Sequence, residues 1–158
     1  GLHGTMADAP QLLAAYNFAH QQFMATTLTN EEKTVVWQTV NVENSCHYCV
    51  PAHTGIAKMM KVDDAITDAL RNETPLPTPE LEALRTFTLA MVRDRGFVSD
   101  ADTQAFLDAG FTQTNILAVI LGAAQKLMSN YTNHFAKTQV DKVFEKFAWE
   151  KKTAIAAE

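Results

Sequence analysis

Cysteine occurs only at positions 46 and 49 of the chain, and a histidine follows at position 53. If this segment is helical, Cys46, Cys49 and His53 are spaced i, i+3 and i+7 and share one face. A disulfide across two intervening residues closes too short a loop to add much stability. In a reducing compartment, this C-x-x-C spacing is therefore typical of a redox-active or metal-binding pair rather than of a structural bridge.

The cysteine pair and the histidine together could carry out thiol-based redox chemistry. A thiol is a weak nucleophile at its ordinary pKa of about 8.5, and His53 could take its proton and return it to a leaving group. Attack on the O–O bond of a peroxide leaves a sulfenic acid, which the second thiol converts into a disulfide. A helix capped by Asn44 or Ser45 would favour a thiolate at Cys46 in its first turn, whereas the spacing of His53 favours Cys49.

Two further residues are candidates for a proton relay. Glu43 lies just before the cysteines. His134 ends the inner stripe predicted for a long helix, where it could equally be a core histidine. The stripe consists of Ile116, Ile120, Ala123, Leu127, Tyr131 and His134. The stretch 129–134 is unusually polar for the inner face of a helix, so its side chains need partners if they are buried.

Two other hypotheses stay open beside the redox one. The first is a metal-binding module, because zinc favours four ligands and the chain could supply them from Cys46, Cys49, His53 and His134. The second is a non-catalytic oligomerisation domain, in which the cysteines would behave as ordinary thiols. The redox hypothesis itself requires neither a metal nor a cofactor.

Helical periodicity dominates the chain, and glycine and proline are few. Thr29, Thr78 and Ser99 have the sequence context of helix N-caps, and Gly96 and Gly110 that of helix stops. The valine-rich stretch 35–42 could form a strand by propensity, but we predict a helix. The expected fold class is all-α, with helices at 9–26, 30–43, 46–60, 63–72, 80–95, 100–109, 113–136 and 140–150.

Length and composition indicate one domain over residues 1–158, since 47% hydrophobic residues can supply a sizeable core. Gly1–Met6 resembles in part a remnant of cleavage and is left out of the fold prediction. Thirteen basic against 18 acidic residues give a net charge of −5, which disfavours binding to nucleic acid or anionic membrane surfaces. No apolar run reaches the roughly 18 to 20 residues of a membrane span, so we expect a cytoplasmic protein.

The pattern C-x-x-C-x-x-x-H at Cys46, Cys49 and His53 resembles the AhpD-like family, which includes alkylhydroperoxidase D and the carboxymuconolactone decarboxylase relatives. Further similarity lies in the Thr-Asn-Glu-Glu-Lys start of the preceding helix, in Tyr48, and in the stretches 102–110 and 130–134. The resemblance implies an AhpD-like helical bundle, a trimer or a larger homo-oligomer such as a hexamer, and no cofactor.

The resemblance also implies a function and roles for the site residues. The activity would be a peroxiredoxin-type reduction of hydroperoxides, driven by a thiol or dithiol reductant that the sequence does not identify. Cys49 corresponds to the peroxide-attacking thiol, Cys46 to the resolving and more accessible thiol, and His53 to the relay base. The family's relay commonly includes a glutamate one helix-length upstream, where this chain has Thr34. Either Glu43 or His134 replaces it, or the relay is broken and the peroxidase activity is weak.

Overall fold

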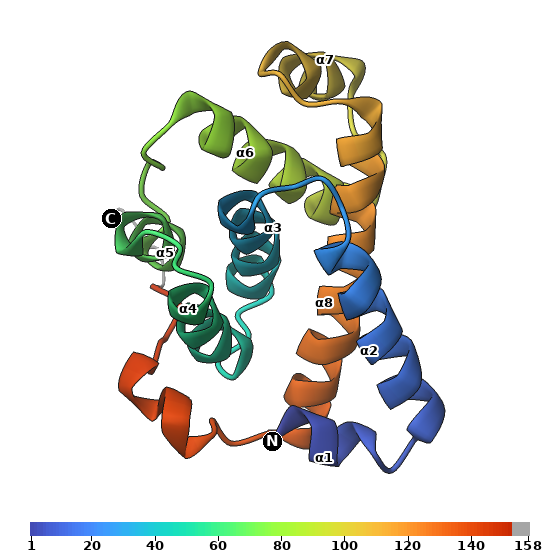
Figure 1. Ribbon diagram of the computed structural model, residues 1–158, viewed down its shortest axis with the longest axis vertical. Coiled ribbons are helices and arrows are strands. Elements are labelled where there is room, and N and C mark those ends of the chain that lie inside the picture. The colour runs from blue at the N-terminus through green and yellow to red at the C-terminus, as the bar shows by residue number, and fades with distance from the viewer. Residues whose placement is uncertain (153–158) are drawn as a thin grey trace, which may run out of the picture.

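The computed structural model describes residues 1–152, and these form helices and connecting segments without β-strands (Figure 1). The predicted all-α fold class is confirmed. In chain order the elements are α1 (Leu2–Met6), α2 (Pro10–Met24), α3 (Asn30–Glu43), α4 (Cys49–Met59), α5 (Asp64–Asn72), α6 (Pro79–Arg93), α7 (Asp100–Asp108), α8 (Gln113–Ala136) and the 3-10 helix η1 (Lys142–Phe147).

Helix α3 lies in the middle of the molecule and has almost no solvent-exposed face. Every residue from Lys33 to Val42 is buried, and α4, α5, α6 and α8 pack around it (Figure 1). A helix that is buried all round needs no amphipathic pattern. This explains why the valine-rich stretch is helical despite its β-propensity, because packing in the core overrides the preference of single residues. The prediction of a helix over 30–43 is confirmed with the same bounds.

Local hydrogen bonds confirm most of the predicted helix ends. Glu32 N–H donates to Thr29 Oγ1 (3.1 Å), and Thr29 N–H donates to the Glu32 carboxylate (2.8 Å), which completes a capping box. Thr78 caps α6 through its hydroxyl, which accepts from Leu81 N–H (3.2 Å). Gly110 (φ 104°) ends α7 in a left-handed conformation that favours glycine. At the end of α6 the left-handed residue is Arg95 (φ 54°), and the predicted stop Gly96 (φ 85°) follows it.

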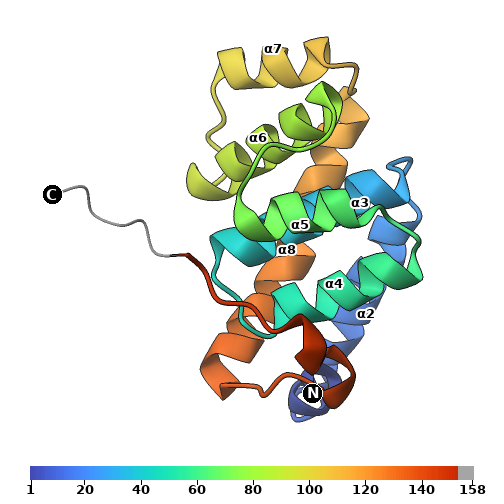
Figure 2. The same cartoon turned by 90° about the vertical axis from the view of Figure 1, so that its left-hand side faces the viewer.

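Two terminal segments differ from the prediction. The segment Gly1–Met6 contains α1, whose Leu2 and Met6 side chains are buried. The helix expected over 140–150 is shortened to η1, after which the chain runs without helical structure past α4 and α5 (Figure 2). Arg71 on α5 holds this segment by donating to the carbonyl oxygens of Phe147 (3.0 Å) and Ala148 (3.1 Å). These tertiary hydrogen bonds replace the helical ones that the local sequence favours.

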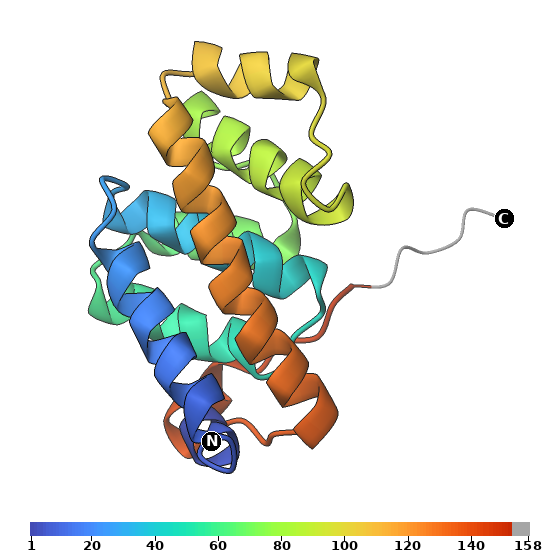
Figure 3. The same ribbon diagram turned by 90° about the vertical axis from the view of Figure 1, so that its right-hand side faces the viewer.

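Helix α8 is the longest element and extends along most of the molecule, with α2 beside it (Figure 3). The two helices approach closely at Gly122, where an added Cβ would lie 2.7 Å from the Phe23 ring. No single helix of residues 1–152 is long and apolar enough to cross a membrane, although α7 and α8 would pass that test as a pair bent by 111°.

Candidate active site

The cysteine pair lies at the sharp turn between α3 and α4. Ser45 adopts a left-handed conformation (φ 53°), and the N–H groups of Ser45 and Cys46 donate to carbonyl oxygens of the last turn of α3 (3.0 and 2.9 Å). This is the hydrogen-bond pattern of a Schellman motif. Helix α4 begins at Cys49, after Tyr48 as an N-cap without a side-chain bond. The prediction that Asn44 or Ser45 caps this helix is wrong, because both residues belong to the end of α3.

Cys46 and Cys49 form a disulfide, with Cα atoms 5.2 Å apart. Cys46 is 0% and Cys49 2% exposed, so Cys46 is not the more accessible residue that the family resemblance implied. Cys49 Sγ accepts hydrogen bonds from Nδ2 of Asn130 (3.1 Å) and Nδ2 of Asn133 (3.3 Å) on α8. Cys49 is also the first residue of α4, where the helix dipole favours negative charge. Cys46 Sγ accepts the first N–H of this helix, that of Cys49 (3.2 Å), so the start of α4 favours a thiolate at either cysteine. The two amide donors from α8 are what distinguish Cys49.

A network of side-chain amides orients one of these donors, Asn130. Asn130 Nδ2 also donates to Asn41 Oδ1 (2.9 Å), and Asn44 Nδ2 donates to Asn130 Oδ1 (2.9 Å). Asn41 Nδ2 in turn donates to Gln38 Oε1 (3.1 Å). Because Asn41 and Asn130 each use both their donor and their acceptor side, the network fixes which side of Asn130 faces the sulfur. The polar stretch 129–134 pointed to this network in the sequence, but its partners on α3 were missed.

His53 lies one turn after Cys49 and forms a hydrogen bond with a buried lysine. The distance between His53 Nε2 and Lys126 Nζ is 2.7 Å. Lys126 is 1% exposed, and its Nζ lies over the rings of Tyr16 (5.7 Å to the centroid) and Trp37 (5.9 Å). Sequence analysis did not identify this lysine, although a charged residue in the middle of a long, otherwise weakly charged helix is the signal that could have revealed it.

Burial determines the proton affinities of this pair. Burial and, to a smaller extent, the nearby Lys126 charge hold the pKa of His53 well below its ordinary value. Burial also lowers the pKa of Lys126 to about 7. The imidazole is therefore neutral at neutral pH, and the lysine amine is partly deprotonated. The pair can take up or release one proton near pH 7, which is the property required of a general acid–base group.

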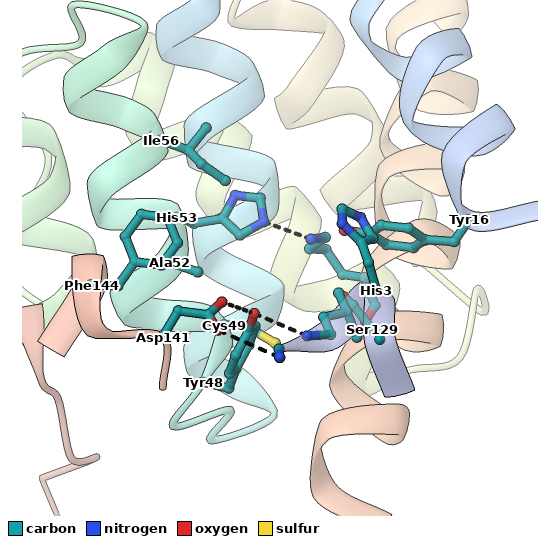
Figure 4. A pocket seen from close by; sticks show the side chains of 14 residues that line it. His3, Tyr16, Tyr48, Cys49, Ala52, His53, Ile56, Ser129, Asp141 and Phe144 are labelled. Carbon is teal, nitrogen blue, oxygen red and sulfur yellow. Dashed lines mark hydrogen bonds and ion pairs between the residues drawn. The ribbon is translucent and has the colours of Figure 1, made fainter. Parts of the chain in front are cut away.

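Cys49, His53 and Lys126 all line one cavity of about 440 Å³ between α4, α8 and the N-terminal segment (Figure 4). Apolar side chains form part of its wall, including Leu2, Ile56 and Phe144. Tyr48 and Asp141 also line the cavity. The Tyr48 hydroxyl donates to Asp141 Oδ2 (2.6 Å) and accepts from Leu2 N–H (3.1 Å). Desolvation and the Asp141 carboxylate raise the pKa of Tyr48 to about 12, so its hydroxyl keeps its proton.

The two relay candidates from the sequence lie away from His53. Glu43 accepts from Arg93 Nε (2.8 Å) and Nη2 (2.9 Å) and lines a different cavity, and the bond from Arg93 lowers the pKa of the Glu43 carboxyl. His134 is exposed and lines a third cavity, next to Cys46. Thr34, at the position of the family's glutamate, is buried and donates to the carbonyl oxygen of Asn30 (2.9 Å). Lys126 is therefore the ionisable side chain that the structure brings to His53.

The inner stripe predicted for α8 was also wrong in part. Ile120 and Tyr131, assigned to the buried face, are 45% and 63% exposed. Polar residues occupy the buried face instead: Gln125, Lys126, Ser129, Asn130 and Asn133. The hydrophobic pattern pointed to the wrong face because this half of α8 directs polar side chains inward.

The described residues do not support the zinc hypothesis. Across residues 1–152, no three His, Cys, Asp or Glu side chains lie close enough together to hold a metal ion. His53 is hydrogen-bonded to Lys126, and His134 lines a different cavity from His53.

The helices are arranged as in two solved structures. One is the crystal structure of an alkylhydroperoxidase AhpD core, an uncharacterized peroxidase-related protein from Ralstonia eutropha JMP134, with a TM-score of 0.80 and 24% identity over 89% of this chain and 76% of that one. This chain has the AhpD-like fold. An uncharacterized peroxidase-related protein from Silicibacter sp. TM1040 shares the AhpD-like fold at a TM-score of 0.73 and 19% identity, over 84% of this chain and 71% of that one. No protein-family model matches the sequence, and no curated protein is significantly similar to it.

Proposed function

We propose that this protein is an oxidoreductase that reduces hydroperoxides through the Cys46–Cys49 pair. The main support for this proposal is the set of contacts around Cys49. Its sulfur forms the disulfide, accepts two amide N–H bonds from α8, and lines the cavity that contains His53 and Lys126. The peroxidase-related proteins with the same fold are consistent with this chemistry.

In the reduced protein, Cys49 is the attacking thiol. Its thiolate is stabilised by the side-chain N–H groups of Asn130 and Asn133. It attacks the terminal oxygen of the hydroperoxide, the O–O bond breaks, and the products are a sulfenic acid on Cys49 and an alcohol. The Cys46 thiol then attacks the sulfenic sulfur, a disulfide forms and water leaves. A thiol or dithiol reductant returns the two electrons.

The His53–Lys126 pair supplies the proton that this reaction requires. Before attack, the neutral pair accepts the proton of the Cys49 thiol, and after attack it donates a proton to the alkoxide that leaves. A carboxylate such as the family's glutamate would hold a positively charged imidazole, whereas burial and, to a smaller extent, the Lys126 charge lower the pKa of His53 and keep it neutral. We infer that the lysine replaces the glutamate as the partner of the histidine and serves as the final proton store.

The cavity fits an alkyl hydroperoxide better than hydrogen peroxide alone. Its volume of about 440 Å³ and its apolar residues Leu2, Ile56 and Phe144 can hold a hydrocarbon group.

We further propose that the protein forms a homo-oligomer, with a trimer or hexamer as the expected state. Large apolar side chains on α8 are exposed, among them Leu117 (62%), Tyr131 (63%) and Phe135 (93%). An apolar row of this kind is typical of an interaction surface. Light scattering coupled to size-exclusion chromatography would test the proposal, and a monomer at micromolar concentration would contradict it.

Turnover of cumene hydroperoxide with dithiothreitol as the reductant tests the enzymatic function. The proposal predicts consumption by the wild type, loss of at least 100-fold in Cys49→Ser, and consumption faster than that of hydrogen peroxide. The single-cysteine variants serve as controls for each other, because each removes the disulfide. Equal activity of both variants and the wild type would overturn the proposal.

A further inference from the structure

A fixed acceptor at one end of the amide network determines the direction of its hydrogen bonds. Gln38 Nε2 donates to the backbone carbonyl oxygen of Val50 on α4 (3.1 Å). Because a carbonyl oxygen can only accept, Gln38 presents its nitrogen to α4 and its Oε1 to Asn41. Asn41 in turn presents its Oδ1 to Asn130 Nδ2. The nitrogen of Asn130 that this chain positions is the one that donates to Cys49 Sγ.

The other end of the network is Asn44, which reaches a different part of the surface. Its side chain is half-buried and lines a groove of about 520 Å³ between α6 and α8. Gln38, Asn41 and Asn130 are each 0% exposed. This groove and the cavity of Cys49 share no lining residue among residues 1–152. Asn44 is therefore the member of the network that can be replaced without changing the wall of the cavity.

Asn44 acts on the acceptor side of Asn130. Its Nδ2 donates to Asn130 Oδ1 (2.9 Å), and residues 1–152 supply no other side-chain donor to this oxygen. A hydrogen bond to the oxygen of an amide polarises the amide and makes its N–H groups stronger donors. The Asn130 N–H group lies 3.1 Å, from nitrogen to sulfur, from Cys49. A thiolate gains more from such a donor than a thiol does, because hydrogen bonds to charged acceptors are stronger.

We infer that Asn44 is a positioning residue for Cys49: by donating to Asn130 Oδ1, it holds the Asn130 N–H group on the sulfur and stabilises the thiolate. The inference rests on the proposed role of Cys49 as the attacking thiol. Asn44 does not line the cavity for the peroxide and acts through Asn130. The hydrogen bond between His53 and Lys126 involves neither asparagine, so this effect is separate from proton uptake by that pair.

A double-mutant cycle that measures the pKa of the Cys49 thiol tests the inference. In Cys46→Ser, Cys49 is the only cysteine of the chain. Thiolate formation is followed by the absorbance at 240 nm as the pH is raised, and each protein has its cysteine-free counterpart as the blank. Asn44→Ala, Asn130→Ala and the double variant are compared in this background. Since no peroxide is present, the pKa can be measured whether or not the protein is a peroxidase.

Asn72→Ala is the matched control for Asn44→Ala. Both asparagines lie at the C-terminal end of a helix, directly before a residue in a left-handed conformation. These following residues are Ser45 (φ 53°) and Glu73 (φ 55°). The Nδ2 of Asn72 donates to the carbonyl oxygen of Asp68 (2.8 Å), which is not part of the network. The control therefore removes the same amide from a similar position without affecting the network.

We expect Asn44→Ala to raise the pKa of Cys49 by about 0.5, and Asn130→Ala, which removes the hydrogen bond itself, to raise it by about 1. Once Asn130 is absent, Asn44→Ala should cause no further rise, because the two residues act in series. Asn72→Ala should leave the pKa unchanged. An unchanged pKa in Asn44→Ala, equal shifts in Asn44→Ala and Asn72→Ala, or additive shifts in the double variant would overturn the inference.

Discussion

Replacing Lys126 by methionine should change the pH dependence of stability. The side chain is buried, and its pKa in the folded protein is about 7, against an ordinary value of 10.5. Between these values the unfolded chain binds one more proton than the folded chain, so the free energy of unfolding rises with pH. Below pH 7 the lysine is protonated in both states, and the full penalty of burying the charge is present. Lys126→Met removes this contribution and should flatten the curve.

The expected slope follows from one proton. The free energy of unfolding of the wild type should gain about 1.4 kcal/mol per pH unit from Lys126 over this range. Between pH 7.5 and 9.5, the free energy of unfolding of the oxidised protein, measured with urea, should then increase by roughly 2 to 3 kcal/mol more in the wild type than in Lys126→Met. The variant also leaves His53 Nε2 without its partner, but the imidazole is neutral throughout this range, so that loss does not vary with pH.

Lys61→Met is the control, because it removes the same amine from an exposed position. Its stability should follow the wild-type pH curve. If Lys126→Met also ran parallel to the wild type between pH 7.5 and 9.5, the lysine would not be the buried proton store described above, and the proposed role of its pair with His53 would fail with it.

Three further predictions concern single contacts. Asn133→Ala removes one N–H bond to Cys49 Sγ and should lower the rate of iodoacetamide alkylation of the reduced protein at pH 7 roughly fivefold, and an unchanged rate would contradict the role of this donor. Gly122→Ala places a Cβ 2.7 Å from the Phe23 ring and should reduce the free energy of unfolding by about 1 to 3 kcal/mol in urea titrations, whereas a neutral effect would mean that the helices can separate freely. Thr29→Ala removes the capping box of α3 and should reduce the free energy of unfolding by about 1 kcal/mol, with no change in peroxide turnover.

Much of the fold could be predicted from the sequence because its helix ends are encoded locally. The bounds of α3 and α8 agree with the prediction, since Thr29 and Thr112 cap them with hydrogen bonds inside four residues of chain. The start of α4 at Cys49 was missed, because the turn before it depends on a left-handed Ser45. Serine rarely adopts this conformation, so no residue type announces it.

Of the candidate site, only the residues that are close in sequence could be singled out in advance. Cys46, Cys49 and His53 share one segment, and the spacing of the motif made them candidates. Lys126 reaches His53 from a position 73 residues further along the chain, so only the packing of α8 against α4 shows the pair. Glu43 was chosen for its closeness in sequence, but Arg93 binds its carboxylate at a different cavity.

The central claim is that Cys49 attacks the peroxide and Cys46 resolves the sulfenic acid. Trapping the sulfenic acid tests this claim most directly. Reduced Cys46→Ser and Cys49→Ser proteins are treated with one equivalent of cumene hydroperoxide in the presence of dimedone and analysed by peptide mass spectrometry. The account predicts a dimedone adduct on Cys49 in Cys46→Ser and at most a slow, unspecific adduct in Cys49→Ser. A faster and more complete adduct on Cys46 in Cys49→Ser would contradict it.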